Sequence, residues 1–235
     1  LAIVLMSVAM LVATFCAGAV SASAAQPDIV GDTYTTWVDN ASDLEEAFMQ
    51  AYDGETIILS NDINFQYNSY QIQTDADGDV VLDLNGYSIF VWTDQKSLID
   101  LSVGDTHLHI VNSDPSYDSS VEIFTDTADA SVVSIDNPNS SLSVYEGADL
   151  CLNAQKSSNQ VGSYNRTATI RAKAFKDIRI IGSDILNLAE NGSAVELITF
   201  STTGYANSTF EVTGNAKLTA DTFAIDLSDA YDYPK

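Results

Sequence analysis

Five of the nine basic residues in the chain fall within one short stretch. Arginine and lysine bind carboxylates and acidic sugars through charge-assisted hydrogen bonds, so this stretch is the first candidate for a binding site. Arg171, Lys173 and Arg179 each have an apolar residue on both sides, and the alternation of a strand would turn them outward. The sequence predicts an electropositive stripe for an acidic sugar or a partner's carboxylate; the alternative is ion pairing with acids on neighbouring strands, such as Glu196 and Glu211. The full set is Arg166, Arg171, Lys173, Lys176 and Arg179.

Three aspartates are candidates for acid and base catalysis. Glycoside hydrolysis requires two carboxylates at a defined separation. Asp83, Asp100 and Asp136 occupy strand positions that would turn them outward. Because we assign these residues to different sheets, we expect no catalytic pair and assign no catalytic residue.

Two patterns could bind a metal ion. His107 and His109 flank Leu108 and would project from one face of a strand, where they could supply two ligands. The sequence offers no third and fourth ligand, so we assign no metal site and interpret them as a surface pair. The acidic run 75–79 could bind calcium, although it lacks the later bidentate glutamate of an EF-hand loop. We expect no cofactor, with calcium as the one candidate ion.

A group of aromatic residues precedes Gln71. Phe65, Tyr67 and Tyr70 lie in a long excursion, where exposed rings could stack on sugars or contact another protein. We therefore add Tyr67 and Tyr70 to the candidate binding residues. The alternative is that the rings cover the core beside a neighbouring helix.

The elements that must position these residues are short strands. In the stretch 80–91, aliphatic residues alternate with others, and Asn85-Gly86 marks a tight corner. Similar strands recur in triplets whose first members start at 98, 131, 167, 194 and 223, so the steps are 33, 36, 27 and 29 residues. A step near 30 residues is typical of a solenoid in which loops project outward. The corner between the second and third strand recurs at Gly86, Gly147, Gly182 and Gly214.

One helix is predicted, over Asp43 to Tyr52, because its apolar residues recur at helical spacing. Ser42 and Glu45 form a capping box at its start. A helix ahead of a strand array indicates a cap over the first coil, whose apolar end must be covered. We predict an all-β fold built as a parallel solenoid; the alternative is a β-sandwich.

Composition limits the partners. The chain has 235 residues, with 33 acidic and 9 basic residues and a net charge of -24. This charge argues against binding to nucleic acid or to an anionic membrane. Cys16 and Cys151 form no disulfide framework, and Cys151 is interpreted as a small packed thiol.

The first 25 residues are uncharged and mostly apolar, and they end in a cluster of small residues. This pattern is typical of a secretory signal peptide, with a transmembrane anchor as the alternative. We predict a signal peptide over 1–25, a lead-in with a first strand over 26–41, and a solenoid domain over 42–235 that continues beyond the given sequence. The protein is expected to be secreted or on the cell surface, with no membrane insertion after cleavage.

Two segments carry a family resemblance. Ala41 to Ile63 resembles the capping helix and first strand of pectin-lyase-like right-handed parallel β-helices. Leu82 to Ile89, which reads Leu-Asp-Leu-Asn-Gly-Tyr-Ser-Ile, resembles a coil of that group, which is common in large secreted proteins of Gram-positive bacteria. The resemblance covers roughly Tyr34 to the C-terminus and implies a right-handed parallel β-helix with three strands per coil and an N-terminal capping helix.

The resemblance leaves the function open, because this scaffold carries polysaccharide lyases, glycoside hydrolases and non-catalytic adhesin domains alike. We expect a non-catalytic scaffold or adhesin-like domain of a bacterial surface protein that binds a glycan or an extracellular protein. The alternative is the N-terminal part of a polysaccharide lyase or glycoside hydrolase.

Overall fold

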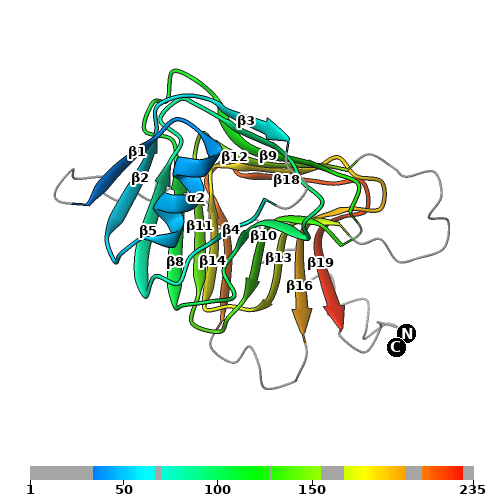
Figure 1. Ribbon diagram of the computed structural model, residues 1–235. Helices are drawn as coiled ribbons and strands as arrows, with labels where there is room; N and C mark the ends of the chain where they lie inside the picture. The colour runs from blue at the N-terminus through cyan, green and yellow to red at the C-terminus, as the bar shows by residue number, and fades with distance from the viewer. Residues whose placement is uncertain (1–33, 67–69, 128, 155–166, 200–207, 230–235) are drawn as a thin grey trace, which may run out of the picture.

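Three parallel sheets form the walls of one coiled structure (Figure 1). The computed structural model describes residues 34–66, 70–127, 129–154, 167–199 and 208–229. Each coil passes through sheet A, then sheet B, then sheet C. Sheet A contains β1 (Thr35–Val38), β2 (Glu55–Leu59), β5 (Gly78–Asp83), β8 (Thr106–Val111), β11 (Ser141–Tyr145), β14 (Asp177–Ile181) and β17 (Thr209–Thr213). Sheet B contains β3 (Ile63–Gln66), β6 (Ile89–Trp92), β9 (Ser119–Thr125), β12 (Ala148–Ala154), β15 (Asp184–Asn187) and β18 (Lys217–Thr219). Sheet C contains β4 (Ile72–Gln73), β7 (Ser97–Asp100), β10 (Ser131–Asp136), β13 (Ala168–Ala174), β16 (Ser193–Thr199) and β19 (Phe223–Asp229).

The prediction of a right-handed parallel β-helix with three strands per coil is confirmed. Within each sheet, every strand pairs in parallel with the strand of the adjacent coil, as in the pairing of β5 with β8 and of β8 with β11. The alternative of a sandwich is wrong, because a sandwich is built from antiparallel strands. In sheet C the strands from β7 onward begin at residues 97, 131, 168, 193 and 223, within one residue of the predicted positions.

Aliphatic residues stack in rows inside the coil. Leu82, Ile110, Val144 and Ile180 are register partners on successive strands of sheet A, and each has 0% of its surface exposed. All four belong to one continuous core. Each such buried side chain contributes roughly 1.5–3 kcal/mol of hydrophobic stabilisation. No single coil could bury its inner face alone, so the stacking of coils holds the fold together.

Glycine occupies four of the six corners between sheet A and sheet B. Gly86, Gly147, Gly182 and Gly214 have φ angles of 82°, 79°, 75° and 67°. The predicted repeat of glycine at this corner is confirmed. Residues with a side chain rarely adopt this left-handed backbone conformation, and this is why glycine recurs here.

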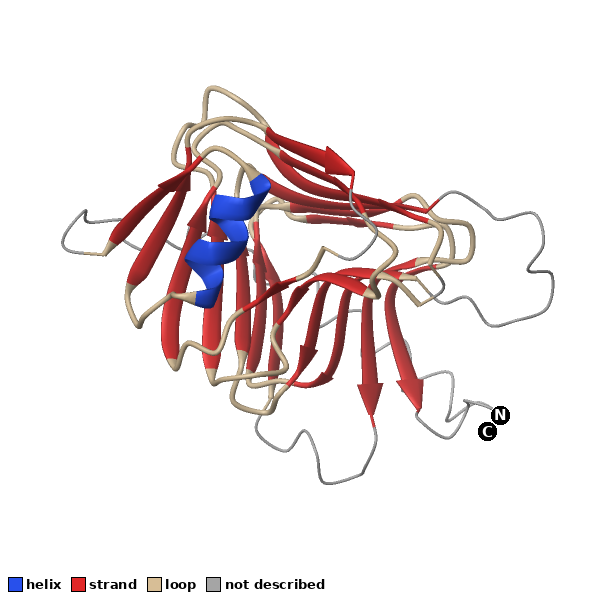
Figure 2. Ribbon diagram, in the orientation of Figure 1, coloured by secondary structure: helices blue, strands red, loops and turns tan. Residues whose placement is uncertain are grey.

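The single helix of the described residues, α2 (Ala41–Met49), lies across the first coil (Figure 2). It buries Leu44 and Phe48 and contacts β1, β2, β3 and β4. Its N-cap is Asn40, whose side chain accepts hydrogen bonds from the backbone N–H groups of Ser42 and Asp43. The predicted start at a Ser42 capping box is therefore wrong by two residues, because Asn40 provides an equally good acceptor earlier in the chain.

At the opposite end of the described residues, the apolar side chains of β19 are exposed. Leu197 is 9% exposed, whereas its register partner Leu227 on β19 is 73% exposed. Val195 is fully buried, whereas its partner Ile225 is 40% exposed. The apolar rows that are covered in the earlier coils thus reach the surface at β19.

Candidate functional site

The predicted basic stripe is divided between two walls of the coil. Arg171 and Lys173 lie on β13 in sheet C, whereas Arg179 lies on β14 in sheet A. The expectation of one continuous stripe is wrong, because the bend between β13 and β14 turns these strands into different sheets. Arg166 lies outside the described residues.

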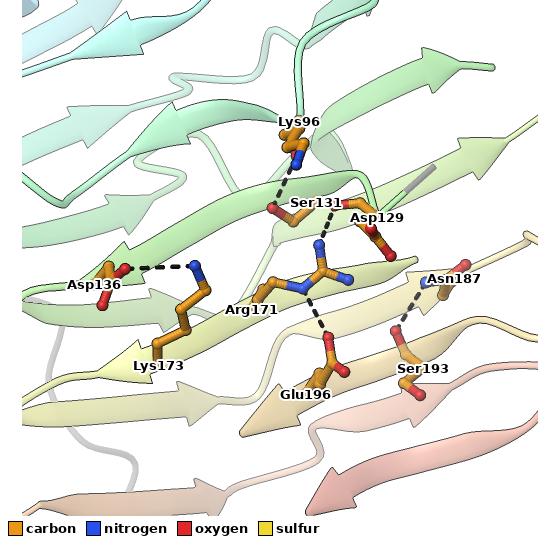
Figure 3. Close-up of polar contacts among 9 residues, drawn as sticks. All are labelled: Lys96, Asp129, Ser131, Asp136, Arg171, Lys173, Asn187, Ser193 and Glu196. Carbon is orange, nitrogen blue, oxygen red and sulfur yellow. Dashed lines mark hydrogen bonds and ion pairs between the residues drawn. The ribbon is translucent and has the colours of Figure 1, made fainter. Parts of the chain in front are cut away.

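Arg171 forms a buried ion pair. Its Nε donates to Oε2 of Glu196 at 2.7 Å, and its guanidinium group also donates to the carbonyl oxygen of Asp129 (Figure 3). The side chains of Arg171 and Glu196 are 9% and 1% exposed. The two residues are register partners on β13 and β16. Arg171 therefore joins adjacent coils through a charge-assisted bond that water hardly reaches.

The other two predicted cations pair on the surface. Nζ of Lys173 lies 3.4 Å from Oδ2 of Asp136 on the preceding strand of sheet C (Figure 3). Nε of Arg179 lies 3.8 Å from Oε2 of Glu211, its register partner on β17. The alternative of pairing with acids on neighbouring strands, Glu196 and Glu211 among them, is thus confirmed. Ligand binding by Arg171, Lys173 and Arg179 stays a prediction.

The three candidate aspartates do not lie in three different sheets. Asp83 is in sheet A, but Asp100 and Asp136 both lie in sheet C on the adjacent strands β7 and β10, which corrects the prediction. Oδ1 of Asp83 accepts hydrogen bonds from the backbone N–H groups of Asn85 and Ser113, each at 2.9 Å, and this side chain is buried. Oδ1 of Asp100 accepts from the backbone N–H of Ser102 at 3.1 Å. These carboxylates hold corners and strand ends in place.

His107 and His109 project from one face of β8, as predicted. Nδ1 of His107 lies 3.4 Å and Nε2 of His109 lies 3.2 Å from Oδ1 of Asp79 on the preceding coil. Nδ1 of His109 lies 3.4 Å from the hydroxyl of Tyr145 on the next coil. In the described part of the chain, no group of three or more His, Cys, Asp or Glu residues is placed to hold a metal ion. In the acidic run 75–79, Asp77 accepts a backbone hydrogen bond from Asp105 at 3.0 Å.

Tyr70 packs beneath the helix. Its ring is 7% exposed and meets Phe65 edge to face, with ring centroids 4.3 Å apart. Its hydroxyl donates to the carbonyl oxygen of Ala41 at 2.7 Å. Burial, with a smaller effect from the charge of Glu45, raises the pKa of Tyr70. The expectation of an exposed ring at Tyr70 is wrong, and its alternative of covering the first coil is confirmed; Tyr67 lies outside the described residues.

A groove beside the cap helix gathers aromatic residues that the sequence analysis missed. This groove, called here the aromatic groove, lies between α2 and β1 and has a volume of about 410 Å³. Tyr34, Trp37 and Tyr52 line it and are 54%, 60% and 67% exposed. The signal that could have found them is the alternation in β1, where the buried Val38 turns Trp37 outward. The remaining lining residues are Thr35, Thr36, Asp43, Glu46, Ala47, Gln50 and Glu55.

Hydrogen bonds fix the acidic wall of the aromatic groove. Glu55 is buried, and it accepts from the hydroxyl of Thr36 at 2.7 Å and from the backbone N–H of Tyr52 at 3.1 Å. The amide of Gln50 donates to Glu46 at 2.9 Å. The ring centroids of Tyr34 and Tyr52 are 6.4 Å apart, with 46° between the ring planes. The groove thus combines exposed rings with carboxylates held in place by the first coil.

Cys151 lies on the outer face of sheet B and is buried. Burial, and then the negative charge of Glu122, raises the pKa of the thiol to about 12. A thiol that stays protonated is a poor nucleophile, which agrees with the predicted role as a small packed side chain.

Across the described segments, α2 is too short and too polar to cross a bilayer, and no other helix is present there. Comparison of the chain with protein-family models, with curated proteins and with solved structures gave no match.

Proposed function

We propose that this chain is a non-catalytic, secreted β-helical scaffold of a bacterial surface protein, related to the pectin-lyase-like group, which binds a glycan or an extracellular protein. The observation that carries the proposal is the pairing of charged side chains between neighbouring coils. Arg171 contacts Glu196, Lys173 contacts Asp136, and Arg179 contacts Glu211.

These pairs support a structural use of the charges. A lyase needs a basic group that reaches the substrate, and a hydrolase needs two carboxylates that flank the bond to be cleaved. In this chain, the carboxylate of Asp83 accepts hydrogen bonds from two backbone N–H groups, and the guanidinium of Arg171 donates to the buried carboxylate of Glu196. Side chains that join successive coils stiffen the solenoid, and a stiff, soluble solenoid suits a stalk or an adhesive surface.

The composition of the N-terminal segment supports secretion. Residues 1–25 are uncharged and rich in apolar side chains, which is the pattern of a signal peptide. Expression of the full chain, with a second form lacking 1–25, tests this part of the proposal. The full chain is expected in the medium or on the cell surface, and retention of both forms inside the cell would contradict it.

A combined activity and binding assay tests the scaffold role. The protein is incubated with neutral and acidic polysaccharides while reducing ends are measured, and it is also applied to an array of glycans and extracellular-matrix proteins. We expect saturable binding without release of reducing ends. Release that is abolished by Asp100→Asn or Arg179→Ala would instead support a lyase or hydrolase.

A further inference from the structure

We infer that the aromatic groove binds a sugar that carries a free amino group. The inference deepens the proposed binding function and rests on it. The groove has the two parts that such a ligand needs: exposed aromatic rings for the sugar ring, and carboxylates for the ammonium group.

The rings fit the apolar face of a sugar. Tyr34, Trp37 and Tyr52 keep more than half of their surface exposed, although each belongs to or adjoins a regular element of the first coil. A sugar ring presents C–H groups on its faces and hydroxyls at its edge, so it stacks on an aromatic ring while its hydroxyls reach polar neighbours. The amide of Gln50 and the hydroxyl of Thr35 belong to the lining and provide such neighbours.

The charge of the groove selects the kind of sugar. Among its described lining residues are three carboxylates, those of Asp43, Glu46 and Glu55, and no Lys, Arg or His. An acidic sugar would be repelled, and a neutral sugar would gain nothing from this charge. An ammonium group would pair with a carboxylate and could also lie over an aromatic face, an attraction that is strongest for tryptophan.

The position of the groove favours a preformed site. Glu55 is held by Thr36 and by the backbone of Tyr52, so this carboxylate stays in place without a ligand. The helix α2 and strand β1, which form the two walls, both contact the first coil of the solenoid. Preorganisation of this kind lowers the entropy cost of binding.

Calorimetric titration of the whole protein with four oligomers of equal length tests the inference. The probes are a glucosamine oligomer, its N-acetylated form, a galacturonate oligomer and an oligolysine peptide. We expect binding of the glucosamine oligomer and at least about tenfold weaker binding of the other three, since tenfold corresponds to about 1.4 kcal/mol for one lost ion pair or one lost stacking contact. Equal binding of the N-acetylated form would overturn the ammonium part, and equal binding of oligolysine would overturn the sugar part.

Matched variants locate the site. Trp37→Ala and Glu46→Gln are each expected to weaken the glucosamine oligomer at least about tenfold. Tyr117→Ala and Glu146→Gln change an exposed ring and an exposed acid outside the groove and are expected to have no effect. A thermal unfolding curve verifies that each variant is folded. Loss of binding in the control variants to the same extent would overturn the inference. Binding of the glucosamine oligomer that Trp37→Ala leaves unchanged would overturn it too, but would leave the proposed scaffold function standing.

Discussion

The same pairing of an arginine with a glutamate on the next coil occurs in two environments. Arg171 and Glu196 are buried at 2.7 Å, whereas Arg179 and Glu211 are each 49% exposed and lie 3.8 Å apart. Breaking a buried pair leaves a charge that water cannot solvate. When an exposed pair is broken, water solvates both charges, so little stability is lost. The two pairs therefore allow the effect of burial to be measured at nearly constant chemistry.

Glu196→Gln is expected to destabilise the protein by about 3–5 kcal/mol, because the buried guanidinium of Arg171 would lose the carboxylate that its Nε contacts at 2.7 Å. Glu211→Gln, the matched control, is expected to cost less than about 1 kcal/mol. The midpoint of urea unfolding, followed by circular dichroism, measures both. Equal effects of the two variants would show that burial does not govern the first pair.

The thiol of Cys151 gives a prediction of pH dependence. Its pKa is raised from 9.0 to about 12, chiefly by burial. The folded state therefore favours the protonated thiol, and this contribution to stability is complete below pH 9 and is lost as the pH rises from 9 towards 12. In a Cys16→Ser variant, which leaves Cys151 as the one thiol in the chain, we expect slow alkylation at pH 9 in buffer and fast alkylation in urea. Alkylation at the same rate in both conditions would contradict the assignment.

Sequence reasoning placed single side chains better than it placed their surroundings. The alternation in β13 indicated correctly that Arg171 leaves the apolar row, because that follows from the two-residue period of a strand. Its burial depends on Glu196 and on the carbonyl of Asp129, which come from other coils. The same limit applies to Tyr70, whose covering helix lies about one coil earlier in the chain.

At the scale of elements, the strands were predictable and their grouping into a site was not. The strands show two-residue alternation, and four of the six corners from sheet A to sheet B contain a glycine, so local patterns were enough to place them. Arg171 and Arg179 are close in sequence, yet the turn between β13 and β14 places them in different walls. The aromatic groove joins a strand, a helix and the turn that follows it, and no single pattern in the sequence contains all three.

The start of α2 can be tested directly. Asn40→Ala removes the acceptor for the N–H groups of Ser42 and Asp43 and is expected to cost about 1 kcal/mol. Ser42→Ala is the matched control and is expected to have little effect, because the N-cap lies at Asn40. Thermal unfolding measures both variants. A larger loss for Ser42→Ala would restore the capping box that the sequence suggested.

At the scale of the whole molecule, the position of a side chain along the coil axis decides how much it contributes to the free energy of unfolding. The helix α2 covers the apolar rows at one end, and β19 leaves them exposed at the other. Some register partners in a row are identical residues, such as Leu197 and Leu227, and their surroundings differ mainly in the coils above and below them. The same substitution can therefore be made in a middle coil and in the last described coil, and the two losses of stability can be compared.

Leu197 and Leu227 are one such pair, being direct register partners on β16 and β19. Leu197→Ala is expected to destabilise the protein by about 2–5 kcal/mol, because it removes buried methyl groups and leaves a cavity between coils. Leu227→Ala, at a side chain that is already 73% exposed, is expected to change stability by less than about 0.5 kcal/mol. Urea unfolding of both variants at low protein concentration measures the difference. A loss at Leu227 as large as that at Leu197 would mean that another structure covers β19 in solution, and size measurement by analytical ultracentrifugation would then show whether a second copy supplies it.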